Sequence, residues 1–414
     1  MRRLPDIPVD APGALAWVGE QLDGLTSGPV MSSDVRGGQQ AADEALASFD
    51  VAGYARRRNE VWPVARRGAS GLSPYIRHGL LDLPRVWDHV GSGPADDARR
   101  FRDELLWQEY ARHVYARLGD ATRRSLRFSV PEHLTRTDNP WVSEAACLTS
   151  GWSELTERGW LPNQVRMWLA SHWAVRSGHG WREGEDLFFR HLLDGSRAAN
   201  RVGWQWTVGA LTGKPYGFSR WQVTKRAAPL CATCPLEHRC PIEQWPEETE
   251  LPPRGTVDPR VRRDPDVGRT AGPSAAEVSG VPEAVWLTAE SLGDDDPALS
   301  SWPEPPAVFV FDDALLRRLR LSAKRLAFLA ESLADLSTRR TVEVWRGDPV
   351  QVLAGRSVAA TFAPVPGWRR RSREVDIVAL HPWRWLVEPH AGPVTSFTAW
   401  SRSSGGVRGG AGRR

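Results

Sequence analysis

The sequence predicts an α + α/β protein, in which an all-helical domain is followed by a smaller α/β domain. Three observations lead to this prediction. Residues 37–245 show helical periodicity and almost no strand alternation. Residues 246–281 are rich in Pro, Gly and charged residues, which is typical of a linker. After this linker, short β-rich runs flank an amphipathic helix, the order expected of a mainly parallel sheet.

The composition is that of a protein with substantial cores. The chain has 414 residues, of which 41% are hydrophobic and 25% charged. No apolar run approaches the length of a membrane span, and the first residues lack the apolar core of a secretory signal. We therefore expect a cytoplasmic protein without a membrane partner. The net charge of +4 permits nucleic-acid binding but does not predict it.

The helical domain at residues 37–245 is preceded by residues 1–36, which we expect to be a weakly patterned lead-in. The clearest helix occupies residues 96–119, where Asp96 or Asp97 is expected to cap the start and Gly119 to end it. The apolar residues that recur there at helical spacing are Phe101, Leu105, Tyr110 and Val114.

The α/β domain is expected at residues 282–400. Four β-rich runs predict its strands: EAVWLT, AVFVF, TVEVW and VDIVAL. An amphipathic helix lies between the second and third runs, with Ser322 as its expected cap. Residues 401–414 have the composition of a disordered tail.

Two helical stretches carry polar groups that are unusual for plain packing. Asn163, Arg166 and Met167 lie at i, i+3 and i+4, so one helix face presents an amide, a guanidinium and a thioether. In the second stretch Asn200 and Trp204 lie four residues apart. Taken alone, these sets fit a packed core as well as they fit a binding site.

Three of the four cysteines lie within ten positions. Cys231, Cys234 and Cys240 have the spacing C-x2-C-x5-C, and Cys147 lies well upstream. Because a cytoplasmic protein has little use for disulfides, this pattern favours a metal site. The pattern is compatible both with zinc and with a [4Fe–4S] cluster.

Six strings occur in order along the helical domain: GYARRRN, GASGLSPYIRHGLL, ELLWQEYARH, GWLPNQVRM, WREGE and DGSRAANRVGWQW. Together they resemble the flavin-binding helical domain of the DNA photolyase and cryptochrome family. The resemblance implies an all-helical, photolyase-type FAD-binding domain at residues 37–245. It also implies roles for single residues, by their positions in these strings.

On the cofactor side, the resemblance implies that Arg166 and Asp194 form an ion pair beside the isoalloxazine ring of FAD. Asn200 would lie near the flavin N5 atom. The phosphate and ribose side of FAD would be contacted by Tyr54, Ser70, Leu72 and Ser73.

On the substrate side, the residues expected to hold a flipped-out pyrimidine dimer are Glu104, Trp107, Asn163, Met167 and Trp206. Arg58 would contact a DNA phosphate. Trp204 and Trp181 match the inner and middle members of the family's electron-transfer chain. Trp141 and Trp152 are both candidates for the outer member.

The resemblance also concerns the cysteines, and this chain departs from the family at several positions. The layout of Cys147, Cys231, Cys234 and Cys240 is similar to that of the family's iron–sulfur branch, which implies a [4Fe–4S] cluster, with zinc as the alternative. Pro162, Gln108 and Ser196 stand where the family has histidine, arginine and aspartate.

The C-terminal segment resembles the amino-terminal, Rossmann-like α/β domain of the same family. The chain would then be circularly permuted, with residues 246–281 as the new join. AESLGDD replaces the family's Arg-Asp-Leu-Arg string, so the antenna chromophore stays unknown. We expect this domain to brace the flavin domain.

The activity that the resemblance implies is light-dependent repair of damaged DNA. A monomeric lyase would transfer an electron from reduced FAD to a pyrimidine dimer, with the cyclobutane dimer favoured and the 6-4 photoproduct as another substrate. Two alternatives stay open. One is a cryptochrome-like blue-light sensor without repair activity, and the other is an iron–sulfur nucleic-acid-binding protein.

Overall fold

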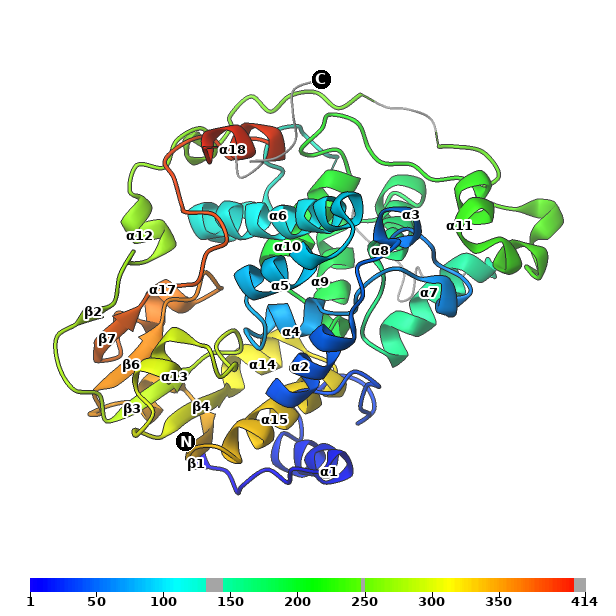
Figure 1. The fold of residues 1–414 in the computed structure, drawn as a ribbon. Coiled ribbons are helices and arrows are strands. Elements are labelled where there is room, and N and C mark those ends of the chain that lie inside the picture. The colour runs from blue at the N-terminus through cyan, green and yellow to red at the C-terminus, as the bar shows by residue number, and fades with distance from the viewer. Residues whose placement is uncertain (132–143, 247–249, 406–414) are drawn as a thin grey trace.

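The computed structural model describes residues 1–131, 144–246 and 250–405, and in it a helical part packs against a sheet (Figure 1). The predicted fold class is confirmed, because the helices come first and the parallel strands lie in the C-terminal region. Among the described residues, no helix is both long enough and apolar enough to cross a membrane.

The sheet has seven strands: β1 (Arg2–Arg3), β2 (Glu277–Val278), β3 (Ala284–Leu287), β4 (Ala307–Asp312), β5 (Val342–Gly347), β6 (Val358–Thr361) and β7 (Ile377–His381). Their order is β1-β5-β4-β3-β6-β7-β2. The central five pair in parallel. Numbered from β3, they follow the order 3-2-1-4-5 of a doubly wound sheet.

Burial explains the strands that the sequence predicted, and composition explains the central strand that it missed. Every residue of β3 and β4 is buried, so both read as continuous apolar runs. The missed central strand is β6, whose sequence VAAT is half alanine, a residue depleted in strands. The two edge strands, β1 and β2, are short, exposed and antiparallel, which limits further pairing at the edges.

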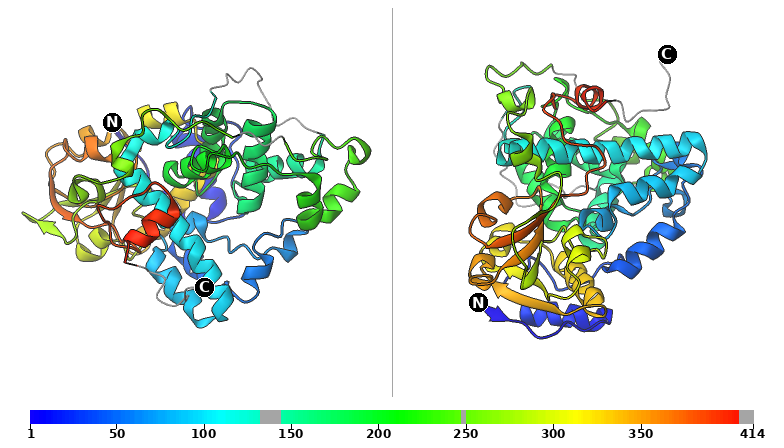
Figure 2. Two further views of the ribbon diagram at one scale, coloured as in Figure 1. Left: turned by 90° about the horizontal axis from the view of Figure 1, so that it is seen from above. Right: turned by 60° about the vertical axis from the view of Figure 1, so that its left-hand side comes forward.

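The helical part is arranged around α6 (Ala95–Leu118). The other helices up to residue 232 are α1 (Ala11–Gln21), α2 (Gln39–Ser48), α3 (Tyr54–Arg57), α4 (Ser73–Arg77), α5 (Leu83–His89), α7 (Ala146–Glu157), α8 (Asn163–Ser171), α9 (Trp181–His191), α10 (Arg197–Thr207) and α11 (Arg220–Ala232). The right-hand view of Figure 2 shows α6, in cyan, crossing the upper half of the molecule above the sheet.

Helix α6 confirms the predicted periodicity but not its predicted cap. Its four recurring apolar residues are buried, and Gly119 ends the helix with a φ of 54°. The N-cap residue is Pro94 rather than an aspartate. Asp97 instead accepts hydrogen bonds from the backbone N–H groups of Gly53 (2.7 Å) and Ala55 (2.8 Å). Asp97 therefore fixes the start of α3, a contact that helix periodicity does not reveal.

The described residues of the segments expected as lead-in, linker and tail contain helices and strands. Within residues 1–36, β1 pairs with β5, and α1 packs against α15 (Ala323–Ser337). Within residues 246–281, α12 (Val267–Ala271) packs against α6, where Asp264 and Arg117 form a buried ion pair at 3.3 Å. The last helix, α18 (Phe397–Ser403), extends into the expected tail, and residues 406–414 lie outside the described residues.

The remaining helices of the α/β part are α13 (Pro297–Ser301), α14 (Asp313–Leu319), α16 (Pro349–Val352) and α17 (Trp368–Arg371). Helix α15 is buried along nearly its whole length and joins the two parts. Ser322 is its N-cap residue, as predicted, although its hydroxyl makes no capping bond. Arg325 donates to the backbone oxygens of Phe189 and Gly195 in the helical part.

His78 is a second link between the two parts. Its Nδ1 lies 2.6 Å from the carbonyl oxygen of Ala289, and its Nε2 lies 3.0 Å from that of Leu193. The ring is buried, and burial lowers its pKa to about 3. The imidazole is thus neutral at ordinary pH and donates to one of the two carbonyls.

The buried His78 predicts that acid destabilises the contact between the helical part and the α/β part. The unfolded chain protonates His78 near its ordinary pKa of 6.5, whereas the folded chain does so near 3. The folded state therefore loses stability as the pH falls below that ordinary value, by about 2 kcal/mol near pH 5 from this group. In His78→Gln this contribution is absent, so the difference in unfolding free energy between about pH 7 and pH 5 should shrink accordingly. Denaturant titration measures this difference, and an unchanged value would contradict the prediction.

Candidate functional site

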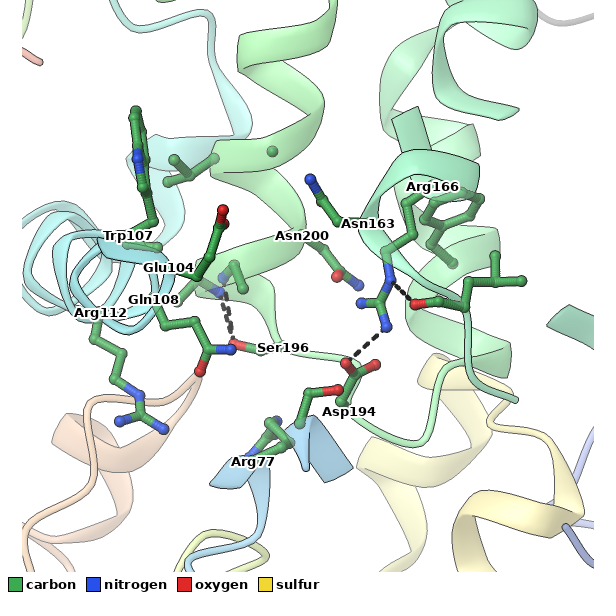
Figure 3. Close-up of a pocket in the computed structure, with 18 of the residues that line it drawn as sticks. Arg77, Glu104, Trp107, Gln108, Arg112, Asn163, Arg166, Asp194, Ser196 and Asn200 are labelled. Atoms are coloured by element: carbon green, nitrogen blue, oxygen red, sulfur yellow. Dashed lines mark hydrogen bonds and ion pairs between the residues drawn. The ribbon is translucent and has the colours of Figure 1, made fainter. Parts of the chain in front are cut away.

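A cavity of about 740 Å³ opens between helices α4, α6, α8 and α10 (Figure 3). Its size lies within the range of pockets that hold cofactors. Pro364, Val365 and Trp383 of the α/β part also line it. The site is therefore built from both parts of the chain.

Local sequence explains the placement of α10 and the space beside it. Ser196 is the N-cap residue, and its Oγ accepts from the backbone N–H groups of Ala198 (3.2 Å) and Ala199 (3.4 Å). Gly203 of α10 and Gly71 before α4 line the cavity, and a Cβ at either position would meet no described atom within 4 Å. The cavity wall is thus open at both points.

A partly buried ion pair lies at the inner end of the cavity. Arg166 Nη2 lies 2.8 Å from Asp194 Oδ2, and Arg166 Nε donates to the carbonyl oxygen of Leu161 at 2.9 Å. Within the described ranges, Asp194 Oδ1 and the Asn200 amide nitrogen are buried and have no hydrogen-bond partner. Figure 3 shows both side chains beside the cavity.

These unpartnered groups fit a flavin. Buried polar atoms are almost always hydrogen-bonded, so an unpaired acceptor and an unpaired donor facing one space point to a polar ligand. The isoalloxazine ring carries both donors and acceptors on a flat apolar frame. The residues that the sequence assigned to FAD are therefore compatible with it.

A second ion pair lies near the mouth, between Arg58 and Glu104. Burial raises the pKa of the Glu104 carboxyl, and the Arg58 charge lowers it in part. Trp107 lies one helical turn further along α6 and has an exposed fraction of 39%. Across the cavity, Asn163 Nδ2 lies 3.5 Å from Met167 Sδ.

The cavity brings together most of the predicted side chains: Tyr54, Arg58, Ser70, Ser73, Glu104, Trp107, Asn163, Arg166, Met167, Asp194, Asn200, Trp204 and Trp206. Leu72 is fully buried instead, and its backbone N–H donates to Ser70 Oγ at 3.3 Å. Trp181 is buried in the helical core, beyond the cavity wall. The role predicted for each stays a prediction.

The tryptophans that lead away from the cavity share one core. Trp204 lines the cavity, and a Cβ at Gly184 would lie 2.2 Å from its ring and 3.0 Å from that of Trp173. Both rings therefore pack over this glycine of the WREGE string. Trp173 was not predicted. Of the candidates for an outer member, Trp152 lies on α7, and Trp141 lies outside the described residues.

The four cysteines lie in one region, because α7 packs against α11. The backbone N–H of Ala146 donates to Cys234 Sγ at 3.4 Å, next to Cys147. Burial raises the pKa of the Cys147 thiol, and the three other thiols raise it further. No three ligand side chains of the described chain are arranged to hold a metal ion.

Sequence reasoning missed several residues of the cavity. Arg77, Arg112, Glu290, Trp383 and Phe397 line it and come from elements far apart in the chain. Arg77 forms an ion pair with Glu290 across the two parts. No local pattern marks such residues, because their contacts depend on the packing of the α/β part against α4 and α6.

Comparison with known proteins agrees with this geometry. Residues 101–227 match the family model described as the FAD binding domain of DNA photolyase. A deoxyribodipyrimidine photo-lyase of Synechococcus sp. is 32% identical over 187 residues, which are 42% of this chain and 37% of that protein. One from Thermus thermophilus is 31% identical over 181 residues, covering 42% of this chain and 43% of that protein. The chain thus spans less than half the length of these relatives.

Solved structures of similar proteins include a Synechocystis sp. cryptochrome. It has a TM-score of 0.45 and 21% identity, and the match covers 51% of this chain and 50% of that chain. The helices around the cavity and the match to the family model lead to one conclusion. Residues 101–227 form a helical domain that is similar to the FAD-binding domain of DNA photolyase.

Proposed function

We propose that this protein is a light-dependent DNA repair lyase that acts on pyrimidine dimers. The observation that carries the proposal is the cavity lining, which combines residues expected around FAD with residues expected around a flipped-out dimer. The curated photolyases that match the chain support the same activity.

The inner end of the cavity would hold FAD. Asp194 Oδ1 and the Asn200 amide nitrogen, which have no hydrogen-bond partner among the described residues, would bond to the flavin ring, and Arg166 orients Asp194. Ser70 and Ser73 offer hydroxyls to the phosphates. When reduced and excited by light, bound FAD supplies the electron that opens the dimer and then takes it back.

The mouth would hold two extrahelical pyrimidines. Trp107 and Trp206 offer flat apolar surfaces that replace the stacking lost when the bases leave the duplex. If a DNA phosphate draws Arg58 away, Glu104 loses its counter-charge. Burial already raises the pKa of Glu104, and loss of the Arg58 charge would raise it further, which favours a protonated carboxyl that can donate a hydrogen bond to a pyrimidine carbonyl.

We propose the cyclobutane dimer as the substrate rather than the 6-4 photoproduct, because the cavity contains the residues that the resemblance to cyclobutane-dimer photolyases assigns to that lesion. The same lining also favours repair over signalling. Glu104, Trp107 and Met167 all face the cavity, and a sensor that acts through a protein partner has no need of this substrate set.

We also propose that Cys147, Cys231, Cys234 and Cys240 hold a [4Fe–4S] cluster that stabilises the contact of α7 with α11. The proposal is supported by the shared location of the thiols and by the Ala146 N–H that already faces Cys234. Binding would require the thiols to close around the metal, because the described residues form no ready-made site.

The chain order supports the further proposal of a circular permutation, with a flavin domain at residues 37–245 and an α/β domain at residues 282–400. The doubly wound sheet begins with β3, after the helical part rather than before it. Residues 246–281 would be the new join.

Glu104→Gln tests repair. Gln keeps the shape of the side chain but neither balances Arg58 nor donates as a carboxylic acid. Light-driven reversal of a dimer-containing oligonucleotide by the reduced protein should slow on the order of 10- to 100-fold. Asp96→Asn, an exposed change on the same helix, is the control and should repair normally. Absence of light-dependent reversal by the unaltered protein would refute the proposed function.

Trp204→Phe tests the electron path. It removes the indole that lines the cavity, so light-driven reduction of bound FAD by an external reductant should slow strongly. Trp168→Phe is the control, since Trp168 is equally buried in the same core but does not line the cavity. Absorption spectra during illumination measure the rate. Equal slowing in both variants would indicate a general packing effect.

Cys147→Ser tests the cluster. The purified protein should contain iron at the stoichiometry of a [4Fe–4S] cluster and absorb visible light beyond the flavin bands. The variant should lose both while keeping its FAD. Elemental analysis that finds zinc, or no metal, in the unaltered protein would contradict the cluster.

A further inference from the structure

Trp107 is stacked on a ring from the far end of the chain. The rings of Trp107 and Phe397 lie 4.1 Å apart between centroids, at an interplanar angle of 11°. Tyr110 meets both rings edge-on, at 5.8 Å and 5.9 Å. Trp107 is half exposed, whereas Phe397 is buried. Figure 3 shows Trp107 standing at one side of the cavity, with Glu104 and Asn163 on its inner side.

Helix α18 holds Phe397 in place through several contacts. Ser396 caps the helix by accepting from the backbone N–H of Ala399 at 3.1 Å. Trp400 Nε1 donates to His113 Nδ1 at 3.2 Å, and the Tyr110 hydroxyl donates to the carbonyl oxygen of Val394 at 3.0 Å. Both His113 and Tyr110 belong to α6. The same helix that presents Trp107 therefore also anchors the segment that supports it.

We propose that Phe397 is a positioning residue, which backs one face of Trp107 so that the other face is held ready to stack on the lesion. The proposal rests on the proposed repair function. A half-exposed tryptophan on a helix surface samples several rotamers, and ordering it on binding costs free energy. Parallel stacking on a buried ring restricts Trp107 before the lesion arrives. Binding of the lesion then costs less conformational entropy of the Trp107 side chain.

This role makes a directional prediction. In Phe397→Leu, an apolar side chain remains but the flat surface is lost. Dissociation constants for a dimer-containing oligonucleotide, measured in the dark with oxidised protein, should rise roughly 3- to 10-fold. The effect should appear in the dissociation constant more than in the repair rate at saturating DNA, and Phe397→Tyr should restore tight binding.

Phe362→Leu is the matched control. Phe362 is a similarly buried phenylalanine that packs on Trp368 in the α/β part, outside the cavity lining. Equal weakening in both leucine variants would indicate general destabilisation and overturn the proposal. Tighter dimer binding in Phe397→Leu would also overturn it, because Phe397 would then cover the stacking face. If the unaltered protein does not distinguish dimer-containing from undamaged DNA, the repair function itself fails instead.

Discussion

The loop of residues 193–196, between α9 and α10, is the point on which the site depends. It sets the start of α10 and hence the positions of Asn200 and Trp204. The side chains that hold it come from three other parts of the chain: Arg77, His78, Arg166 and Arg325. The carbonyl oxygens of Leu193 and Gly195 and the carboxylate of Asp194 thus each have a guanidinium or imidazole partner. A shift of the α/β part would therefore be transmitted directly to the cavity.

Gly195 is the reason the loop can be held so closely. Its carbonyl accepts from Arg77 Nε and from Arg325 Nη2, both at 3.0 Å. A Cβ at this position would lie 2.7 Å from Arg325 Nη1 and 2.8 Å from the carbonyl oxygen of Leu192. Any larger residue would push α15 away from the loop. The close contact of the two parts thus requires glycine here.

The guanidinium groups around this loop also set the electrostatics of the cavity. Arg325 is fully buried, and burial together with the nearby charge of Arg77 lowers its pKa to about 9, while Asp194 opposes the shift. Arg325 nonetheless stays charged near neutral pH. Asp194 thus lies close to two guanidinium groups, that of its ion-pair partner Arg166 and that of the buried Arg325.

Local patterns were enough to predict the helices that bear the site but not the contacts that arrange them. The i, i+3, i+4 spacing placed Asn163, Arg166 and Met167 on one face, and that face lines the cavity. The role of Asp97 was missed because it caps α3 rather than its own helix. Phe397 was missed because it meets Trp107 across most of the chain. Composition did not reveal that the described residues 250–281 include α12 and the buried side chains of Leu251, Val261 and Ala271.

The α/β part has little space at the place where doubly wound sheets bind ligands. That place is the switch point, here at the carboxyl ends of β3 and β6. The buried Asp296 carboxylate accepts there from Thr361 Oγ1 at 2.8 Å and from the N–H of Ala298 at 3.1 Å. The hollow beside them measures about 40 Å³, which leaves room for a water molecule but not for a cofactor. Side chains at this position contact a ligand in other doubly wound sheets, whereas here they hydrogen-bond to one another. This supports the expectation that the domain braces the flavin domain.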